Sequence, residues 1–316
     1  MAARLSPSRL AWRSFFRNRT ALVGMVACTL FFVVAMLGLV VTKGEKPLLD
    51  PRHVRLADKF RPPLSFPDGD VLSTEDLPRL GIYLLGTDEL GRDVFARMLE
   101  GAFVSLSVGF VAVGIATAIG IILGGIAGYY GRMRIGIGAF RLMTVDTLIA
   151  GLIDVFLSFP TFFLILTVVA VLKPSIWNIM IVIGLTSWTG PARFVRAEIL
   201  ALREQDFVQA AHALGVPGRA IILRHLIPNA LAPVLVSATL GIAAAILTES
   251  ALSFLGFGVP PPDATWGNIL ADGKNFLFDA SWLTIIPGTA IFIVVLAFYV
   301  FGEGLREAFN PKLRQL

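Results

Sequence analysis

The chain has 316 residues and a formal net charge of +5 at pH 7; 56% of its residues are hydrophobic and 16% are charged. Soluble globular domains carry about 25% charged residues, so this composition excludes an ordinary water-facing surface and indicates a protein that lies in a lipid bilayer. The single cysteine, Cys28, excludes an intramolecular disulfide, and three histidines at wide spacing form no metal-ligand cluster: His53, His212 and His225.

The first apolar segment, residues 20–42, predicts a transmembrane helix. It has the roughly 20 residues that a spanning helix needs. It is too long for the core of a signal peptide, and no small-residue cleavage pattern follows it. We therefore expect a retained anchor. Residues 1–19, which precede it, carry five arginines: Arg4, Arg9, Arg13, Arg17 and Arg19.

Six apolar segments in all are long enough to be candidate transmembrane helices, which predicts an all-α membrane protein: about 20–42, 103–129, 155–172, 176–195, 229–254 and 284–304. Basic residues are concentrated in the amino-terminal segment, in the loops 130–154 and 196–228, and in the tail 305–316. Short loops rich in Lys and Arg face the cytoplasm. We therefore expect both termini in the cytoplasm, and basic residues distributed in this way do not indicate a nucleic-acid partner.

Residues 43–102 are expected on the outer side, as an extended and poorly regular excursion before the membrane domain 103–304. Proline-rich pieces such as Arg61-Pro62-Pro63 support this expectation. Within it, Gly86-Thr87-Asp88-Glu89-Leu90-Gly91-Arg92-Asp93 has the glycine spacing of a phosphate-binding loop. Arg92-Asp93 replaces the Lys-Ser/Thr that holds phosphate and Mg²⁺, so nucleotide binding is not expected. The alternating charges predict a tight, internally salt-bridged turn, and Asp88, Arg92 and Asp93 are candidates for an outer-side contact.

Small residues and one carboxylate mark the second and fifth segments. Gly120 and Gly124, followed by Gly128, form a stripe that lets helices pack closely in lipid. The contact would be within this chain or with a partner membrane subunit across a shared pathway. Glu249, beside Ser250, is an intramembrane carboxylate and thus a functional candidate. Two alternatives stay open for it: a group that faces the pathway, or a salt bridge to Arg92 or Arg97.

Two further positions are singled out by their neighbours. Asp154 precedes Phe156-Leu157-Ser158-Phe159-Pro160 and is expected to cap the start of the third helix, where the helix dipole favours a carboxylate. Trp266 follows a proline-rich outer loop. It is interpreted either as a contact for another protein or as an anchor at the membrane interface.

The polar loop 196–228 contains a short helix-forming stretch, Gln209-Ala210-Ala211-His212-Ala213-Leu214-Gly215, with Pro228 thirteen residues later. Alanine favours helix and lets a partner approach closely, and Gly215 suits a left-handed helix cap. We expect a surface helix that fits a groove of another protein.

These motifs together resemble the permease subunits of ABC importers in the dipeptide/oligopeptide (peptide/nickel) transport family. The loop is similar to their EAA loop, with Gln209, His225 and Ile227 as departures. Residues 84–97, 154–160, 249–256 and 259–268 resemble further family motifs in the same order, although extra residues at 132–143 depart from the family pattern. The resemblance implies a type I importer architecture, multi-pass in the bacterial plasma membrane. It implies contact of Gln209, Ala210, Ala211, His212, Leu214, Gly215 and Pro228 with an ATPase.

The resemblance also implies partners: a second related permease, two ATPase subunits that bind ATP and Mg²⁺, and an extracytoplasmic substrate-binding protein. The chain has no catalytic constellation of its own, so we expect it not to be an enzyme and to bind no cofactor or metal. Two alternatives belong to other classes. An ion-coupled secondary transporter would need more intramembrane ionisable residues and an inverted repeat, and a membrane-embedded enzyme would need catalytic groups. Nickel chelates, glutathione and sugars are alternative solutes within the family.

Overall fold

The computed structural model describes residues 15–44, 47–69, 76–137 and 140–309, most of which are helical. Within these ranges, four helices contain a stretch long and apolar enough to cross a membrane: α2 (Arg19–Thr42), α3 (Val94–Tyr130), α10 (Ile227–Phe254) and α12 (Trp282–Phe309). They correspond to the first, second, fifth and sixth predicted segments. The predicted start of the second segment was wrong, since α3 begins nine residues earlier, where Asp93 caps it by accepting a hydrogen bond from the Phe95 amide.

The third and fourth predicted segments are broken rather than continuous. The third, predicted at 155–172, covers only the end of α4 (Val145–Leu157) and all of α5 (Thr161–Val171). These two helices meet at 78° and together would make a fifth span. Pro160 lies at the break, and proline has no N–H to continue a helix. The fourth, predicted at 176–195, covers α6 (Ile176–Thr186) and the first turns of α7 (Thr189–Arg203), which has Pro191 in its first turn and continues into the predicted loop 196–228. The count of six unbroken helices is therefore not reproduced.

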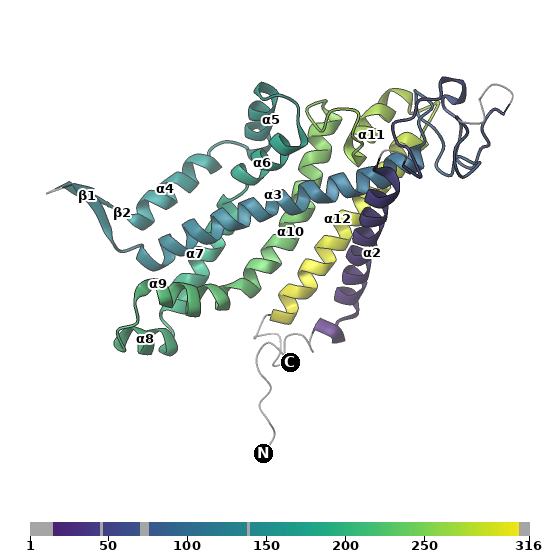
Figure 1. Cartoon of the computed structure of the whole chain (residues 1–316). Helices are drawn as coiled ribbons and strands as arrows, with labels where there is room; N and C mark the ends of the chain where they lie inside the picture. The colour runs from purple at the N-terminus through teal and green to yellow at the C-terminus, as the bar shows by residue number, and fades with distance from the viewer. Residues whose placement is uncertain (1–14, 45–46, 70–75, 138–139, 310–316) are drawn as a thin grey trace, which may run out of the picture.

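The described part of the chain is mostly helical, as predicted, with an exception at the extra residues 132–143. A two-stranded antiparallel hairpin lies there, β1 (Arg134–Ile137) and β2 (Phe140–Thr144). Its sequence contains β-branched Ile135 and Ile137 beside glycines, a pattern that favours strand over helix. The hairpin projects from the end of α3 (Figure 1).

The segment between α2 and α3 is irregular, as predicted. Its only helical turn in the described part is η1 (Leu56–Asp58), and two isolated bridges, Ser65 to Tyr83 and Thr87 to Asp93, hold it together. A short helix, α11 (Trp266–Gly273), and the turn η3 (Lys274–Phe276) follow α10. Figure 1 shows this segment and α11 at one end of the molecule, which we call the α11 end.

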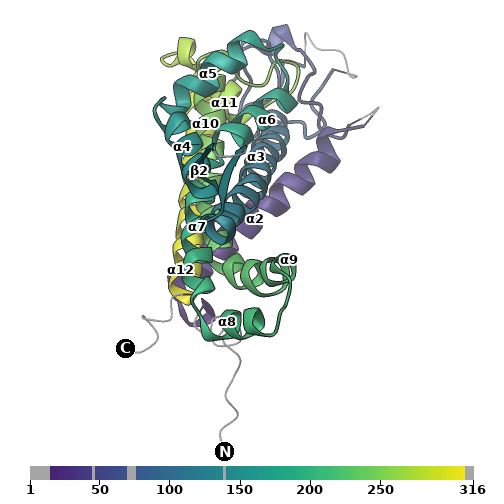
Figure 2. The same cartoon turned by 90° about the vertical axis from the view of Figure 1, so that its left-hand side faces the viewer.

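The loop between α7 and α10 lies at the opposite end, which we call the α8 end. It contains α8 (Asp206–Ala213), α9 (Gly218–Ile221) and a π-helical turn, η2 (Ile222–Leu226), that runs directly into α10. Figures 1 and 2 agree that α8 lies at the same end as the start of α2 and the end of α12. The long helix α3 is central and packs against α2, α6, α7 and α10.

Candidate functional site

The carboxyl end of α8 has the cap that its sequence predicts. Gly215 adopts a left-handed conformation, with φ of +74°. The Gly215 amide donates to the His212 carbonyl (3.0 Å), and the Val216 amide donates to the Ala211 carbonyl (3.1 Å). This pair of bonds is the Schellman motif, which satisfies carbonyls that a helix end otherwise leaves free. The cap fixes a helix of eight residues that would be marginal alone.

The helix α8 has an inward and an outward face. Val208 is fully buried and Ala211 is 7% exposed. On the outward face, Leu214 just past the helix is 83% exposed, and the other residues predicted to contact a partner are also exposed: Gln209, Ala210 and His212. The residues predicted to contact a partner thus fall into two groups. Ala211 packs α8 on its own chain and is not available to another protein, whereas the residues on the outward face are exposed.

The inward face of α8 joins the membrane helices through one hydrophobic cluster. Val208 and Ala211 belong to it with residues of α7, α9, η2 and α10, namely Val195, Ile199, Ile221, Leu226, Ala230 and Val234. Close packing makes such a cluster stiff. The cluster therefore joins α8, α7 and α10 in one packed unit.

Pro228 lies where the loop becomes a membrane helix. It is exposed in the first turn of α10, directly after η2, and the Ile227 amide donates to the Ile222 carbonyl across the π turn. Proline cannot donate the next helical bond, and π turns commonly accompany such interruptions. Pro228 thus marks the junction between η2 and α10 and leaves the two continuous.

A polar groove of about 440 Å³ lies beside α8, lined by Tyr129, Arg132, Arg203, Glu204, Gln209 and His212. Arg203 donates to the Tyr129 carbonyl (3.1 Å), and Gln209 donates to the Arg203 carbonyl (3.0 Å). These bonds join the end of α3 to α7 and α8. A second tie nearby is a bidentate ion pair: Arg196 of α7 donates to both Asp146 oxygens of α4, at 2.5 and 2.7 Å. The hydrogen bond to Asp146 raises the pKa of Arg196.

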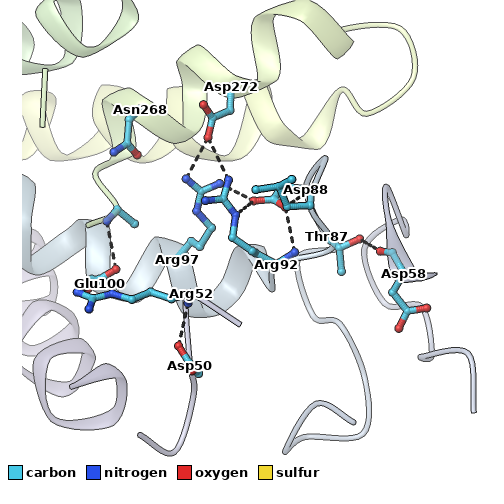
Figure 3. Close-up of polar contacts among 12 residues, drawn as sticks. Asp50, Arg52, Asp58, Thr87, Asp88, Arg92, Arg97, Glu100, Asn268 and Asp272 are labelled. Atoms are coloured by element: carbon cyan, nitrogen blue, oxygen red, sulfur yellow. Dashed lines mark hydrogen bonds and ion pairs between the residues drawn. The ribbon is translucent and has the colours of Figure 1, made fainter. Parts of the chain in front are cut away.

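At the α11 end, Asp88 is the centre of a buried ionic network, as the predicted salt-bridged turn requires (Figure 3). Its Oδ2 accepts from Arg92 Nε (2.7 Å) and Arg97 Nη1 (2.6 Å), and its Oδ1 accepts from two backbone amides. Both arginines also reach Asp272 of α11. The network ties the turn to α3 and α11. Asp88 is fully buried, so the candidate role as an outer-side contact does not fit it.

Asp93 and Trp266 are likewise buried. Asp93 caps α3, and burial raises the pKa of its carboxyl. Trp266 is 2% exposed, and its Nε1 donates to the Met98 carbonyl of α3. Both interpretations offered for Trp266, partner contact and interface anchor, were therefore wrong: it is a core residue that packs α11 on α3 beside Gly101.

Two carboxylates that the sequence did not single out organise the same end. Glu100 accepts from the Ala264 amide (3.1 Å), while Arg52 lies 3.4 Å from Glu100 and 2.7 Å from Asp263. Asp58 is fully buried and accepts from the Tyr83 hydroxyl (2.6 Å) and Arg61 Nε (3.1 Å). Ala264 and Tyr83 are distant from these carboxylates along the chain, and only Arg61, three residues after Asp58, is a local partner.

Glu249 makes neither of the contacts proposed for it. It is fully buried, its Oε1 accepts from Ser253 (2.7 Å), and its Oε2 accepts from Ser105 of α3 (3.4 Å). The salt bridge to Arg92 or Arg97 was wrong, because both arginines bind Asp88 and Asp272. Since Glu249 is enclosed in this chain, it does not face an open pathway. Ser250, its neighbour, is buried against Gly267 of α11.

The glycine stripe of α3 packs against α7 of the same chain. A β-carbon at Gly120 would lie 2.5 Å from Pro191, and one at Gly128 would lie 2.7 Å from Ile199. At Gly124 it would overlap the Ala192 carbonyl. The interpretation of an internal contact is confirmed, and the one of a partner across a pathway was wrong. Asp154, also predicted to cap a helix start, is exposed in the last turn of α4 instead.

Among the described residues no cluster of His, Cys, Asp and Glu suits a metal ion. The features that the described residues present are close helix packing, buried ion pairs and an exposed short helix, α8.

Comparisons with known proteins agree with this architecture. Residues 120–315 match the family described as "Binding-protein-dependent transport system inner membrane component", and residues 6–63 match "N-terminal TM domain of oligopeptide transport permease C". The dipeptide transport system permease protein DppC of Alkalihalophilus pseudofirmus is 37% identical over 98% of this chain and 91% of its own length. DppC of Haemophilus influenzae is 33% identical over 98% and 96%.

A solved structure supports the fold alone. The inward-facing MetNI methionine ABC transporter (native crystal form) contains a chain that is similar with a TM-score of 0.51 at 17% identity, covering 69% of this chain and 98% of that one. The family match extends over more than half of the sequence, and the relatives cover nearly all of it. The chain therefore belongs to the family of inner-membrane permease components of binding-protein-dependent transport systems.

Proposed function

We propose that this chain is the permease subunit of an ABC importer for dipeptides or oligopeptides and forms half of the translocation pathway. The peptide class rests on the relatives, which are named for dipeptide or peptide transport and align over 98% of the chain. The role of a subunit without its own energy source rests on the family and on the absence of a phosphate-binding lysine at Arg92-Asp93.

The helix α8 is proposed as the element that couples this subunit to an ATPase. The observation that supports this proposal is that only one face of α8 is buried. Val208 and Ala211 lie in the chain's own core, whereas Ala210 and Leu214 are exposed. An exposed leucine beside alanine on a rigid helix suits a groove of a partner, because small residues permit close approach and a leucine supplies apolar area.

In this proposal the α8 end lies in the cytoplasm, together with both ends of the described chain, and the α11 end lies outside. Basic residues support the orientation, since Arg196, Arg203, Arg219 and Arg224 are in or beside the α8 loop. Binding of ATP and Mg²⁺ would occur on two partner ATPase subunits. The other expected partners are a second related permease and a substrate-binding protein at the α11 end, in a bacterial inner membrane.

The proposed mechanism is a movement of α8 with its ATPase. Closure of the ATPase dimer would displace α8, and the cluster around Val208 and Ala211 would carry the displacement into α7 and α10. The continuity of η2 with α10 at Pro228 supports this transmission. The pathway would then alternate between inward-open and outward-open states as a population shift between two arrangements.

The test replaces Ala210 with arginine. Ala210 is exposed, so Ala210→Arg should leave membrane insertion and thermal unfolding unchanged while abolishing co-purification with the ATPase and peptide uptake. Ala57→Arg, at an exposed position in η1, is the matched control and should change none of these. Normal association and uptake by Ala210→Arg would contradict the proposal. Ala211→Arg is a poor test because Ala211 is buried and the change would disrupt α8 itself.

A further inference from the structure

The hairpin β1–β2, formed by the extra residues 132–143, has no part in the coupling proposed for α8. It joins α3 to α4, two helices of the membrane domain, and projects past the end of α3 away from α2 and α12 (Figure 1). An isolated two-stranded hairpin is marginally stable at best in water. A surface that covers one of its faces would therefore stabilise it.

One face of the hairpin is apolar and exposed. The strand register places Ile135 opposite Met143, and residues directly opposite each other share a face of the sheet. Met133 precedes Ile135 by two residues, so its side chain lies on the same side. The exposed fractions of Met133, Ile135 and Met143 are 57%, 49% and 44%. Three large apolar side chains that the described part of the chain leaves uncovered indicate an interaction surface.

The opposite face of the hairpin is basic. Arg132 and Arg134 alternate with Met133 and Ile135 along the chain, and both arginines are exposed. Among the described residues neither arginine has an ion-pair partner, and residues 132–145 contain no Asp or Glu. Positive charge without acidic neighbours suits a partner whose surface is negatively charged.

Contacts at the base of the hairpin orient its two faces. The Val145 amide donates to the Met133 carbonyl (2.9 Å), so Val145 continues the apolar side. Val145 packs against the hydrophobic cluster between α3, α4 and α7, which includes Ile149 and Ala192. Arg132 instead lines the polar groove beside α8. The apolar face therefore continues the apolar surface of the membrane helices, and the basic face lies toward the α8 end.

We propose that this hairpin lies on the bilayer surface at the α8 end and binds anionic phospholipids. Its apolar face would enter the boundary between headgroups and acyl chains, and Arg132 and Arg134 would pair with the phosphates of the headgroups. Interfacial membrane elements combine apolar and basic faces in this way, and anionic lipid attracts basic residues next to a membrane helix. The proposal depends on the membrane placement of α3 and α4, and not on the coupling role of α8.

The first experiment uses the purified full-length chain, without other subunits, in nanodiscs of mixed phosphatidylcholine and phosphatidylglycerol. In a Cys28→Ala background, a fluorescent label is attached at Ile135→Cys or at Leu214→Cys, an apolar position at the same end that is 83% exposed. Lipids with a doxyl quencher near the headgroup should quench the first label at least twofold more than the second, and aqueous iodide should give the reverse order. Met133→Cys should behave as Ile135→Cys does. Equal quenching of the hairpin and Leu214 labels overturns the proposal.

A protein subunit is the alternative occupant of the apolar face, and it gives a different result. In that case the Ile135→Cys label would be open to iodide in the isolated chain and would become shielded only when the ATPase or the second permease is added. That outcome overturns the proposal. Failure of α8 to bind an ATPase would leave the lipid result unchanged, because the first experiment contains no ATPase.

Charge variants test the anionic lipid. A change from pure phosphatidylcholine to the mixture should raise doxyl quenching of the Ile135→Cys label at least twofold. Arg132→Gln combined with Arg134→Gln should abolish this rise. The matched control combines Arg219→Gln with Arg224→Gln, which removes the same charge from two exposed arginines of the α8 loop and should retain the rise. A full rise in the hairpin variant overturns the proposal.

Discussion

The Arg97 guanidinium of α3 lies 2.6 Å from Oδ2 of Asp88, and both side chains are almost fully enclosed by the α11 end. The same guanidinium lies 3.0 Å from Asp272 of α11. One arginine therefore joins the loop before α3, the first turns of α3 and the helix that follows α10. This end of the molecule is held as one unit by buried charge rather than by regular secondary structure.

Removal of Arg97 should be strongly destabilising. Arg97→Gln leaves Asp88 buried with Arg92 as its remaining cationic partner, and breaking a buried pair costs about 3–5 kcal/mol. Thermal unfolding in nanodiscs should show a large loss. Arg306→Gln is the control, because Arg306 is exposed in its pair with Glu303 and such pairs contribute about 1 kcal/mol or less. Similar stability for the two variants would contradict the network's importance.

The contact between α3 and α7 can be tested with two adjacent glycines. Gly124→Ala places a methyl group against the Ala192 carbonyl and should separate the helices, whereas the β-carbon position at Gly125 is open. Gly125→Ala should be neutral or stabilise by up to about 1 kcal/mol, since alanine favours helix. Thermal unfolding of the two variants gives the comparison. If Gly124→Ala is as stable as Gly125→Ala, the close packing is not required.

The left-handed cap of α8 predicts a graded response at Gly215. Its β-carbon position is open but its φ is +74°, so backbone strain and not collision decides the outcome. Gly215→Val should cost on the order of 1–2 kcal/mol of local stability, while Gly215→Asn should be better tolerated because asparagine visits this region. Faster hydrogen exchange of the α8 amides in the valine variant than in the asparagine variant is the expected result. Equal exchange in both would count against the cap.

Asp93 predicts a pH dependence with a definite sign. Burial raises the pKa of its carboxyl above the unfolded value of about 3.9. The group's favourable contribution to stability is therefore complete below that unfolded value and is lost as the pH rises through the folded pKa. Asp93→Asn retains a capping oxygen and removes the titration. Relative to wild type, the variant should gain stability between pH 3.5 and pH 7.5, as followed by thermal unfolding. A relative loss over that interval would contradict the raised pKa.

The sequence predicted the features that depend on local chemistry. The cap at Gly215 follows from one glycine after an alanine-rich turn, and α2, α10 and α12 follow from long apolar runs flanked by polar residues. The ionic turn around Asp88 was also predictable, since Arg92 and Arg97 are within nine residues. Each of these depends on neighbours along the chain.

Features that depend on distant partners were missed. The hydropathy pattern did not indicate the breaks at Pro160 and at Ser187-Trp188, because the apolar run continues across both. Glu249 was expected to meet an arginine, but Ser105 of α3 and Ser253 satisfy it, and no pattern near Glu249 indicates Ser105. The inward orientation of Ala211 likewise follows from its packing with α7 and α10. The sequence of the loop does not indicate which face of α8 meets these helices.

Cross-linking from α8 tests the central claim most directly. Cys28 is the only cysteine of the chain, so Cys28→Ala gives a clean background for Ala210→Cys and, as an outer control, Ala57→Cys. In the assembled transporter, Ala210→Cys should form a cross-link to an ATPase subunit whose yield changes when ATP binds, and Ala57→Cys should form none. Failure of Ala210→Cys and of Leu214→Cys to reach the ATPase in an active transporter would contradict the assignment of α8 as the coupling helix.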